Sequence, residues 1–230
     1  MRVWDISPGY LDRQRLLGEH RELHGVHVVL TEGKAGYARH PETIRWVGCL
    51  AALARRHSQL AAEMRLRRYT DRTPLADPPG RCRWPRTFVT DPVDQFALLR
   101  RKYSGAVGGR IPLPRHAQQL WAQHKYSVMA RSIAAYQQTG RLVARRSVSM
   151  SDLAQDLVAT LRERPGRARL MNAIEHMWGH VRAHASADDI SRFKQGPADA
   201  RLAIVQTLAI RHQEPYLIRS TALSELQVYC

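Results

Sequence analysis

Cysteine, phenylalanine and lysine are all scarce in this sequence of 230 residues. The three cysteines are scattered, so we expect neither a disulfide framework nor a Cys-x-x-Cys metal knuckle, and a reducing cytoplasm is the expected location. No apolar run approaches the ~18 residues of a membrane-spanning helix. The first residues also lack the apolar core of a secretory signal, so no membrane association is predicted.

Several motifs of common enzymes are missing as well. The sequence holds no Gly-x-Ser-x-Gly elbow, no Gly-x-Gly-x-x-Gly dinucleotide loop and no His-Glu-x-x-His zinc motif. The loop at residues 31–36 has two glycines and a lysine but lacks the spacing of a phosphate-binding Walker loop. These absences leave hydrolase and Rossmann functions without support, and we predict no cofactor and no metal site.

Positive charge is what the sequence has in excess. It contains 36 Lys+Arg against 20 Asp+Glu, a formal net charge of +16. Only four of the basic residues are lysine, which leaves 36 − 4 = 32 arginines. A surface this basic attracts polyanions, and arginine makes bidentate contacts with phosphates. The composition therefore favours a nucleic-acid partner, although a genome rich in arginine codons would also account for part of the excess.

The pattern of apolar residues predicts an all-α protein with two helical domains and no strand. Residues 1–9 are expected to be extended and to end in a Ser-Pro-Gly turn, and residues 70–92 form a proline-rich irregular segment. Glycine and proline at 105–114 suggest a boundary between domains 1–113 and 114–230. Apolar spacing and cap-type residues predict helices at 10–30, 41–68, 92–103, 116–139, 151–163, 167–184, 187–194 and 197–211.

One face of the first predicted helix carries a carboxylate between two glycines. Gly18, Glu22, Gly25 and Val29 are spaced by four, three and four residues, which places them on the same side of a helix. Glycine costs about 1 kcal/mol relative to alanine in a helix. The use of glycine here suggests that another group approaches Glu22 closely. That group is either a ligand or a second packed helix, and the spacing alone favours neither.

The same stretch carries a family resemblance. Residues 14–23, Gln-Arg-Leu-Leu-Gly-Glu-His-Arg-Glu-Leu, resemble the first helix of the pyrimidine-dimer DNA glycosylases of the phage endonuclease V type. The resemblance continues at Gly33-Lys34 and at residues 65–69. It implies a small helical bundle with DNA glycosylase and abasic-site lyase activity. It also implies that the α-amine of the first residue, here Met1, is the nucleophile and that Glu22 assists it.

The resemblance and the charge together suggest which residues contact nucleic acid. Arg2 and Arg21 are expected to hold phosphates, and Arg15 occupies the position of a histidine in the family. Lys34 is either a phosphate contact or a solvent-exposed loop lysine. Trp84, which lies among arginines, could stack on bases, but a tryptophan closing a small core is the commoner case.

A second resemblance covers most of residues 114–230. Residues 121–126, Trp-Ala-Gln-His-Lys-Tyr, resemble a helical domain of the bacterial YbgA type, as do residues 140–144 and 213–217. That family's activity is not well established, so the resemblance implies a multi-helix bundle rather than a function. Because such domains occur fused to nucleic-acid-modifying domains, His124 and Lys125 are further predicted nucleic-acid contacts.

Two histidine sets have helical spacing but no supporting ligands nearby. His20, His24 and His27 are separated by four and three residues, and a second set stands at 176, 180 and 184. Such spacing places imidazoles on one helical face and can bind zinc. Neither set has cysteines or a catalytic glutamate in the expected place, so a metal is not predicted for either.

The residue types suit imine chemistry. An α-amine has an ordinary pKa of about 8, closer to neutrality than that of lysine at about 10.4. Because the large side chain of Arg2 opposes removal of the initiator methionine, we expect Met1 itself to supply this amine. Damaged double-stranded DNA is the predicted substrate. The alternatives are a binding protein without catalysis, or a protein acting on structured RNA such as transfer RNA. The oligomeric state is not predicted.

Overall fold

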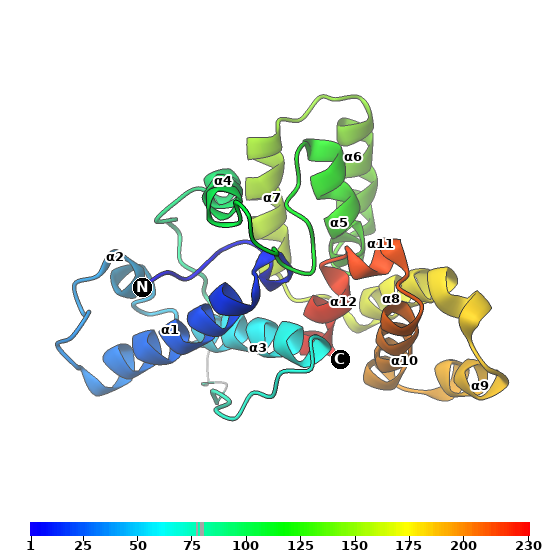
Figure 1. Cartoon of the computed structure of the whole chain (residues 1–230), viewed down its shortest axis with the longest axis horizontal. Coiled ribbons are helices and arrows are strands. Elements are labelled where there is room, and N and C mark those ends of the chain that lie inside the picture. Colours follow the sequence, from blue (N-terminus) through cyan, green and yellow to red (C-terminus); the bar gives the residue numbers. More distant parts are fainter. Residues whose placement is uncertain (77, 79–80) are drawn as a thin grey trace. The chain divides into compact units, whose positions relative to one another are not determined.

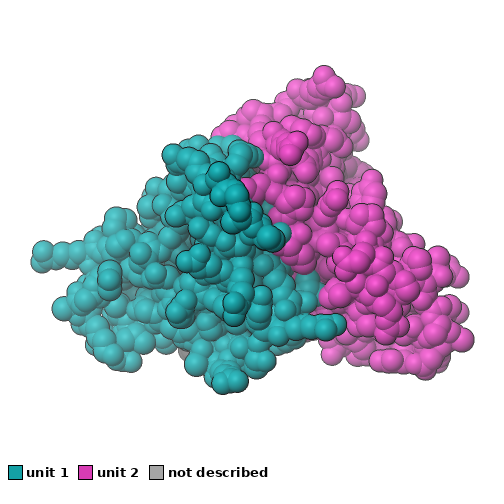
Figure 2. Space-filling model, viewed as in Figure 1, with its two compact units in different colours: residues 1–109 teal, residues 110–230 magenta. Residues whose placement is uncertain are grey.

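The computed structural model describes residues 1–76, 78 and 81–230, so Asp77, Pro79 and Gly80 of the predicted irregular segment lie outside the described residues. Within the described part the chain is all-helical, as predicted, and contains no strand. It divides into two compact units, Met1–Gly109 and Arg110–Cys230 (Figure 2). No helix of the described residues is long and apolar enough to cross a membrane.

The first unit is built on two long helices that pack against each other. Helix α1 spans Arg13–Glu32 and helix α3 spans Leu50–Leu66, with the short α2 (Pro41–Arg45) between them and α4 (Pro92–Lys102) after them (Figure 1). The helix predicted over 10–30 is thus present, but it starts three residues later and ends two residues later than predicted. It starts where Asp12 caps the amide of Arg15 and stops at the left-handed Gly33.

The N-terminal segment is part of the core of this unit. Val3, Trp4 and Ile6 are almost fully buried, and a 3-10 turn, η1 (Pro8–Tyr10), leads from them into α1. Ser7 accepts a hydrogen bond from the Gly9 amide at the start of this turn. The first residues are therefore fixed by packing and do not form a loose tail.

The prediction of one continuous helix over 41–68 is wrong. Helix α2 ends at Arg45, and α3 begins only at Leu50. Between them Gly48 has a φ of +73°, a left-handed conformation that only glycine adopts without strain. The break turns the chain so that α3 can pack on α1.

The second unit is a bundle in which α5 (Ala117–Met129) contacts four other helices. These are α6 (Ile133–Ala144), α7 (Met150–Arg162), α8 (Arg167–Val181) and α12 (Ala222–Glu225). Helix α10 (Ala198–Arg211) packs on α8 and on α9 (Ala187–Gln195). The bundle is completed by α11 (Pro215–Ile218) and by the 3-10 turns η2 (Arg182–His184) and η3 (Leu226–Tyr229).

The prediction of one helix over 116–139 is also wrong. The chain leaves the helix after Met129, and Ser132 caps the start of α6 by accepting a hydrogen bond from the Ala135 amide. Arg131, between the two helices, is buried and forms an ion pair with Glu225. Gly140, the residue that follows the predicted helix 116–139, lies inside α6. The remaining predicted helices of this unit are present within two residues, except that residues 182–184 of the 167–184 helix form a 3-10 turn.

Candidate active site

Glu19 on α1 ties the N-terminal segment to the two long helices. Its carboxylate accepts a hydrogen bond from the Trp4 amide at 3.1 Å and pairs with Arg56 of α3 through two bonds of 2.8 and 3.0 Å. Arg56 also donates to the carbonyl of Ile6 at 3.0 Å. Burial raises the pKa of Glu19, and the adjacent Arg56 opposes that rise. We name this group the Glu19–Arg56 clamp.

A second arginine fixes the same segment from α2. Arg45 donates to the carbonyl of Val3 at 2.9 Å and to the carboxylates of Asp5 and Glu42. The amide of Asp5 in turn donates to the Gln95 side chain at 2.9 Å. The backbone of residues 3–6 is thereby held at successive points, which determines where Met1 can lie.

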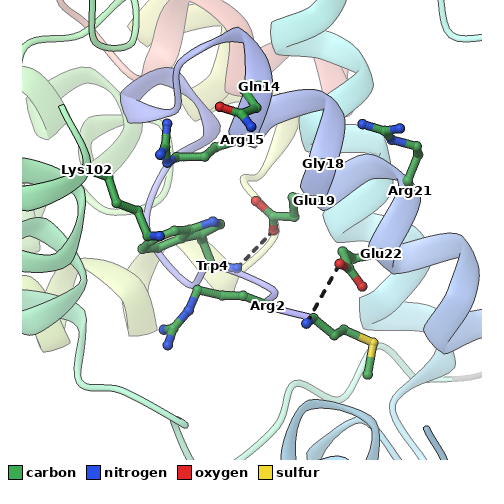
Figure 3. A pocket seen from close by; sticks show the side chains of 10 residues that line it. Arg2, Trp4, Gln14, Arg15, Gly18, Glu19, Arg21, Glu22 and Lys102 are labelled. Carbon is green, nitrogen blue, oxygen red and sulfur yellow. Dashed lines mark hydrogen bonds and ion pairs between the residues drawn. The ribbon is translucent and has the colours of Figure 1, made fainter. Parts of the chain in front are cut away.

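The two predicted catalytic groups come close together. The α-amine of Met1 lies 3.8 Å from Oε1 of Glu22, and a dashed line to Glu22 marks this ion pair in Figure 3. The side chain of Met1 is nearly buried, whereas that of Glu22 is 40% exposed. A carboxylate at this distance can exchange protons with the amine or with a bound reactant after only a small movement.

An open pocket of about 370 Å³ surrounds this pair. Both carboxylates, Glu19 and Glu22, belong to its lining, and Trp4 contributes an aromatic wall (Figure 3). Most of the remaining lining is basic. The full lining is Met1, Arg2, Trp4, Gln14, Arg15, Gly18, Glu19, Arg21, Glu22 and Lys102. Cationic side chains around a carboxylate and an amine suit an anionic ligand.

The basic side chains of the pocket are held to different degrees. Arg2 donates to Thr90 at 3.0 Å and lies over the Trp4 ring, and Arg15 pairs with Asp12. Arg21, by contrast, is exposed and hydrogen-bonds the backbone one turn earlier on α1. Arg21 is therefore better able than Arg2 or Arg15 to turn toward a ligand.

Among the described residues, no helix packs against Gly18 or Gly25 on the glycine-flanked face of α1. A Cβ built on Gly18 or on Gly25 would meet no atom within 4 Å outside the neighbouring helix backbone. The packed-helix explanation for these glycines is therefore wrong for the described residues. The alternative, room for a ligand beside Glu22, fits Gly18, which lines the pocket.

The other predicted nucleic-acid contacts lie outside this pocket. Lys34 is exposed and pairs with Glu32 at 2.9 Å. Trp84 is half-buried against Trp46, with ring centroids 6.0 Å apart. This packing agrees with the commoner case, in which a tryptophan closes a small core. In the second unit, Lys125 lies over the rings of Tyr126 and Tyr216.

His124 differs most from its predicted role. Its side chain is buried inside the second unit, and its Nδ1 lies 2.8 Å from the carbonyl of Leu120. Burial lowers its pKa to about 4. A neutral and buried imidazole cannot contact a nucleic acid directly, so this predicted contact is not supported by the structure.

Four residues of the site were not found from the sequence: Glu19, Arg56, Arg45 and Lys102. Glu19 and Arg56 are 37 positions apart, so no local pattern links them. Two charges within otherwise amphipathic helices are ordinarily solvated, and only the packing of α1 on α3 shows that they are buried together. Lys102 is separated from the N-terminal segment by almost a hundred residues and had no local signal at all.

In the comparisons with known proteins, a different family model matches within each of the two compact units. Residues 1–77 match the family model described as pyrimidine dimer DNA glycosylase, and residues 125–226 match a model described as a protein of unknown function, DUF1722. The first match supports a DNA glycosylase type of function in general terms, and with it a DNA substrate. No curated protein and no solved structure gave a match.

Proposed function

We propose that the first unit is a DNA glycosylase with abasic-site lyase activity, in which the α-amine of Met1 is the nucleophile and Glu22 the assisting carboxylate. The observation that carries this proposal is the 3.8 Å separation of amine and carboxylate inside an open pocket whose lining includes four basic side chains. The family match of residues 1–77 supports the reaction class. Damaged double-stranded DNA is the proposed substrate.

The proposed reaction begins with attack of the neutral amine on C1′ of a damaged nucleotide. The new N–C1′ bond forms as the glycosidic bond breaks, and the electron pair leaves with the base, which is protonated. Opening of the sugar ring then gives a Schiff base. Loss of a proton from C2′ and cleavage of the C3′–O bond releases the 3′ phosphate, and water finally hydrolyses the imine.

Glu22 has two roles in this scheme. Its negative charge stabilises the cationic sugar that develops as the base leaves, and its oxygen can accept and return the protons of the amine. Because the Glu22 side chain is 40% exposed, a sugar can approach its carboxylate from the pocket. The buried Glu19 instead acts as a positioning residue, because both of its oxygens are already occupied by Arg56 and one also by the Trp4 amide.

The pocket also suits a single flipped nucleotide. Its volume of about 370 Å³ lies in the range of small-ligand sites, about 300–1,000 Å³. Damaged bases unstack at lower cost than intact ones, which aids their selection. Arg21, Arg2 and Lys102 would contact the flanking phosphates, and Trp4 would offer an apolar wall to the sugar or the base.

Borohydride trapping on abasic DNA tests the proposal directly. Borohydride reduces a Schiff base to a stable amine, so an active enzyme becomes covalently joined to the DNA. We expect the chain with its native Met1 to give an adduct whose peptide maps to the first residue. The same chain carrying an N-terminal tag should fold and bind DNA but give no adduct. Intact-mass measurement confirms that Met1 is retained.

Two outcomes would overturn this function. An adduct that maps to Lys34 or Lys102 would move the nucleophile to a lysine. Absence of an adduct from the native chain, with DNA binding intact, would identify a binding protein without catalysis. Competition by transfer RNA against duplex DNA separates an RNA partner from the proposed one.

A further inference from the structure

Three imidazoles from two helices converge in the first unit, away from the pocket. His20 and His24 lie one turn apart on α1, and His57 comes from α3. One ring nitrogen from each lies within 4.8 Å of the others. His20 and His57 are buried, at 8% and 2% exposure. His27, which the spacing on α1 had grouped with them, is not part of this set.

A carboxylate completes the group from the segment that follows α3. Asp71 places Oδ1 3.1 Å from Nε2 of His20 and Oδ2 3.9 Å from Nε2 of His57. The amide of Thr73 donates to Oδ1 of Asp71 at 2.9 Å, and the Thr73 hydroxyl lies 3.1 Å from Nε2 of His24. The carboxylate is therefore oriented toward the imidazoles by its own loop.

Two of the distances in the group match those between ligand atoms around a small cation, and the three imidazoles as a set lie within 4.8 Å of one another. Zinc–nitrogen bonds of 2.0–2.1 Å in a tetrahedron place neighbouring ligand atoms roughly 3.3 Å apart. The Nε2 atoms of His24 and His57 lie 3.2 Å apart, and Nε2 of His20 lies 3.1 Å from Asp71. Imidazole nitrogens facing each other at this distance must either share one proton or direct both lone pairs at a cation.

The protonation of the group also suits a metal. Burial, with a smaller contribution from nearby His20, lowers the pKa of His57 to about 4 and lowers that of His24. Burial alone would raise the pKa of Asp71, but the Thr73 amide and the neighbouring histidines outweigh it and hold that pKa below its usual value. These shifts favour the neutral form of His24 and His57 and the ionised form of Asp71, which are the forms that metals bind.

We propose that His20, His24, His57 and Asp71 form a zinc site that joins α1, α3 and the segment after α3. Three imidazole nitrogens and one carboxylate oxygen are typical zinc ligands, and four protein ligands without an open position indicate a structural site. None of the four residues lines the pocket around Met1 and Glu22. The zinc site stabilises the helix pair that carries the active site and takes no part in the reaction there.

Metal binding to the full chain tests this site. The protein is stripped with a chelator and titrated with Zn²⁺, and separately with Co²⁺, whose visible absorption reports tetrahedral nitrogen and oxygen ligands. We expect one equivalent to bind and the melting temperature to rise with added zinc, because zinc binds only the folded state tightly. His24→Ala and Asp71→Ala should each weaken binding by about tenfold or more, and His27→Ala on the same helix should bind as the wild type does.

Failure of the site would be clear from the same measurements. If the wild-type chain binds no Zn²⁺ at micromolar concentration, or if His24→Ala and Asp71→Ala bind it unchanged, the proposal is wrong. His24 is only half-buried and Asp71 lies in a loop, so these variants should keep the helical circular dichroism of the wild type even where His57→Ala does not. The readout is metal content, so it is independent of Schiff-base chemistry at Met1.

Discussion

Gly18 and Gly25 lie on the same face of α1 as Glu22, but only Gly18 lines the pocket. Both positions are helical with open space around them, so alanine fits at either without a clash. We expect Gly18→Ala and Gly25→Ala each to raise the free energy of unfolding by about 0.5–1 kcal/mol, because alanine favours helix. Denaturant unfolding of the two variants measures this gain.

The activities of the same two variants should differ. The methyl group of Gly18→Ala projects into the space beside Glu22, so we expect slower cleavage of abasic DNA from this variant alone. Gly25→Ala is the matched control and should cleave at the wild-type rate. Equal cleavage rates for the two variants would show that the space beside Gly18 is not used by the substrate.

The variant Glu22→Gln tests whether the carboxylate of Glu22 takes part in the proposed reaction. Glutamine keeps the shape but neither carries charge nor accepts a proton, so we expect a loss of about 10²–10⁴-fold in the rate of strand cleavage. Affinity for DNA should stay within a few-fold, since Glu22 contributes no positive charge. Single-turnover cleavage and equilibrium binding give the two numbers. Glu32→Gln, on the same helix but paired with Lys34 outside the pocket, should leave both unchanged.

At the scale of the helices, the Glu19–Arg56 clamp joins α1 to α3 and holds Trp4. Glu19→Gln leaves Arg56 buried without its counter-charge, and loss of one partner of a buried pair costs about 3–5 kcal/mol. We expect denaturant unfolding to show a loss of this size. The double variant Glu19→Gln with Arg56→Met should recover part of it, because no buried charge is then left. Full stability of the single variant would show that the pair does not bear on the packing of the helices.

Burial of His124 within α5 makes the second unit sensitive to pH. Its pKa is about 4 in the folded chain against about 6.5 when unfolded, so the unfolded state takes up a proton first as the pH falls below 6.5. Stability is therefore lost as the pH falls from about 6.5 to about 4, by about 2 kcal/mol at pH 5. His124→Gln does not titrate, so the difference in unfolding free energy between pH 7.5 and pH 5 should shrink by about that amount. If His124→Gln leaves this difference in unfolding free energy unchanged, the low pKa of His124 in the folded chain is wrong.

The helices that could be predicted from the sequence are those with strong local signals. Helix α1 has a capping aspartate and a terminal glycine, and α7 to α10 keep regular apolar spacing between recognisable ends. The missed break between α2 and α3 lies at the left-handed Gly48, whereas the missed break between α5 and α6 involves a non-local contact. Arg131, which follows the end of α5 at Met129, pairs with Glu225, 94 positions away, and no spacing rule contains that information.

The candidate site divides in the same way. Glu22 and Gly18 could be predicted because their relation is a helical period within one element. Glu19 with Arg56, and His57 with His20 and His24, meet only when α3 packs on α1. Both the positioning of Met1 and the proposed zinc site therefore depend on the packing of two helices.

At the scale of the whole molecule, the net charge of +16 predicts that DNA binding depends strongly on salt concentration. Each phosphate that a basic side chain neutralises releases counterions, so the logarithm of the binding constant falls linearly with the logarithm of the salt concentration. The slope is about −0.9 for each phosphate contacted. We expect a steep slope for the full chain on undamaged duplex DNA, where no reaction interferes. A flat dependence would exclude a polyanion as the partner.

Arg21 and Lys34 provide a matched pair for assigning part of that slope. Both are exposed on or beside α1, but Lys34 pairs with Glu32 at 2.9 Å, whereas Arg21 lines the pocket and hydrogen-bonds only the backbone of its own helix among the described contacts. We expect Arg21→Ala to reduce the slope by about one and to weaken binding equally for all DNA sequences. Lys34→Ala should change it less, because Glu32 already offsets its charge. Fluorescence anisotropy at several salt concentrations gives the three slopes. If wild type and Arg21→Ala share one slope, Arg21 does not contact a phosphate; if Lys34→Ala shows the larger change, the DNA follows the end of α1 and not the rim of the pocket.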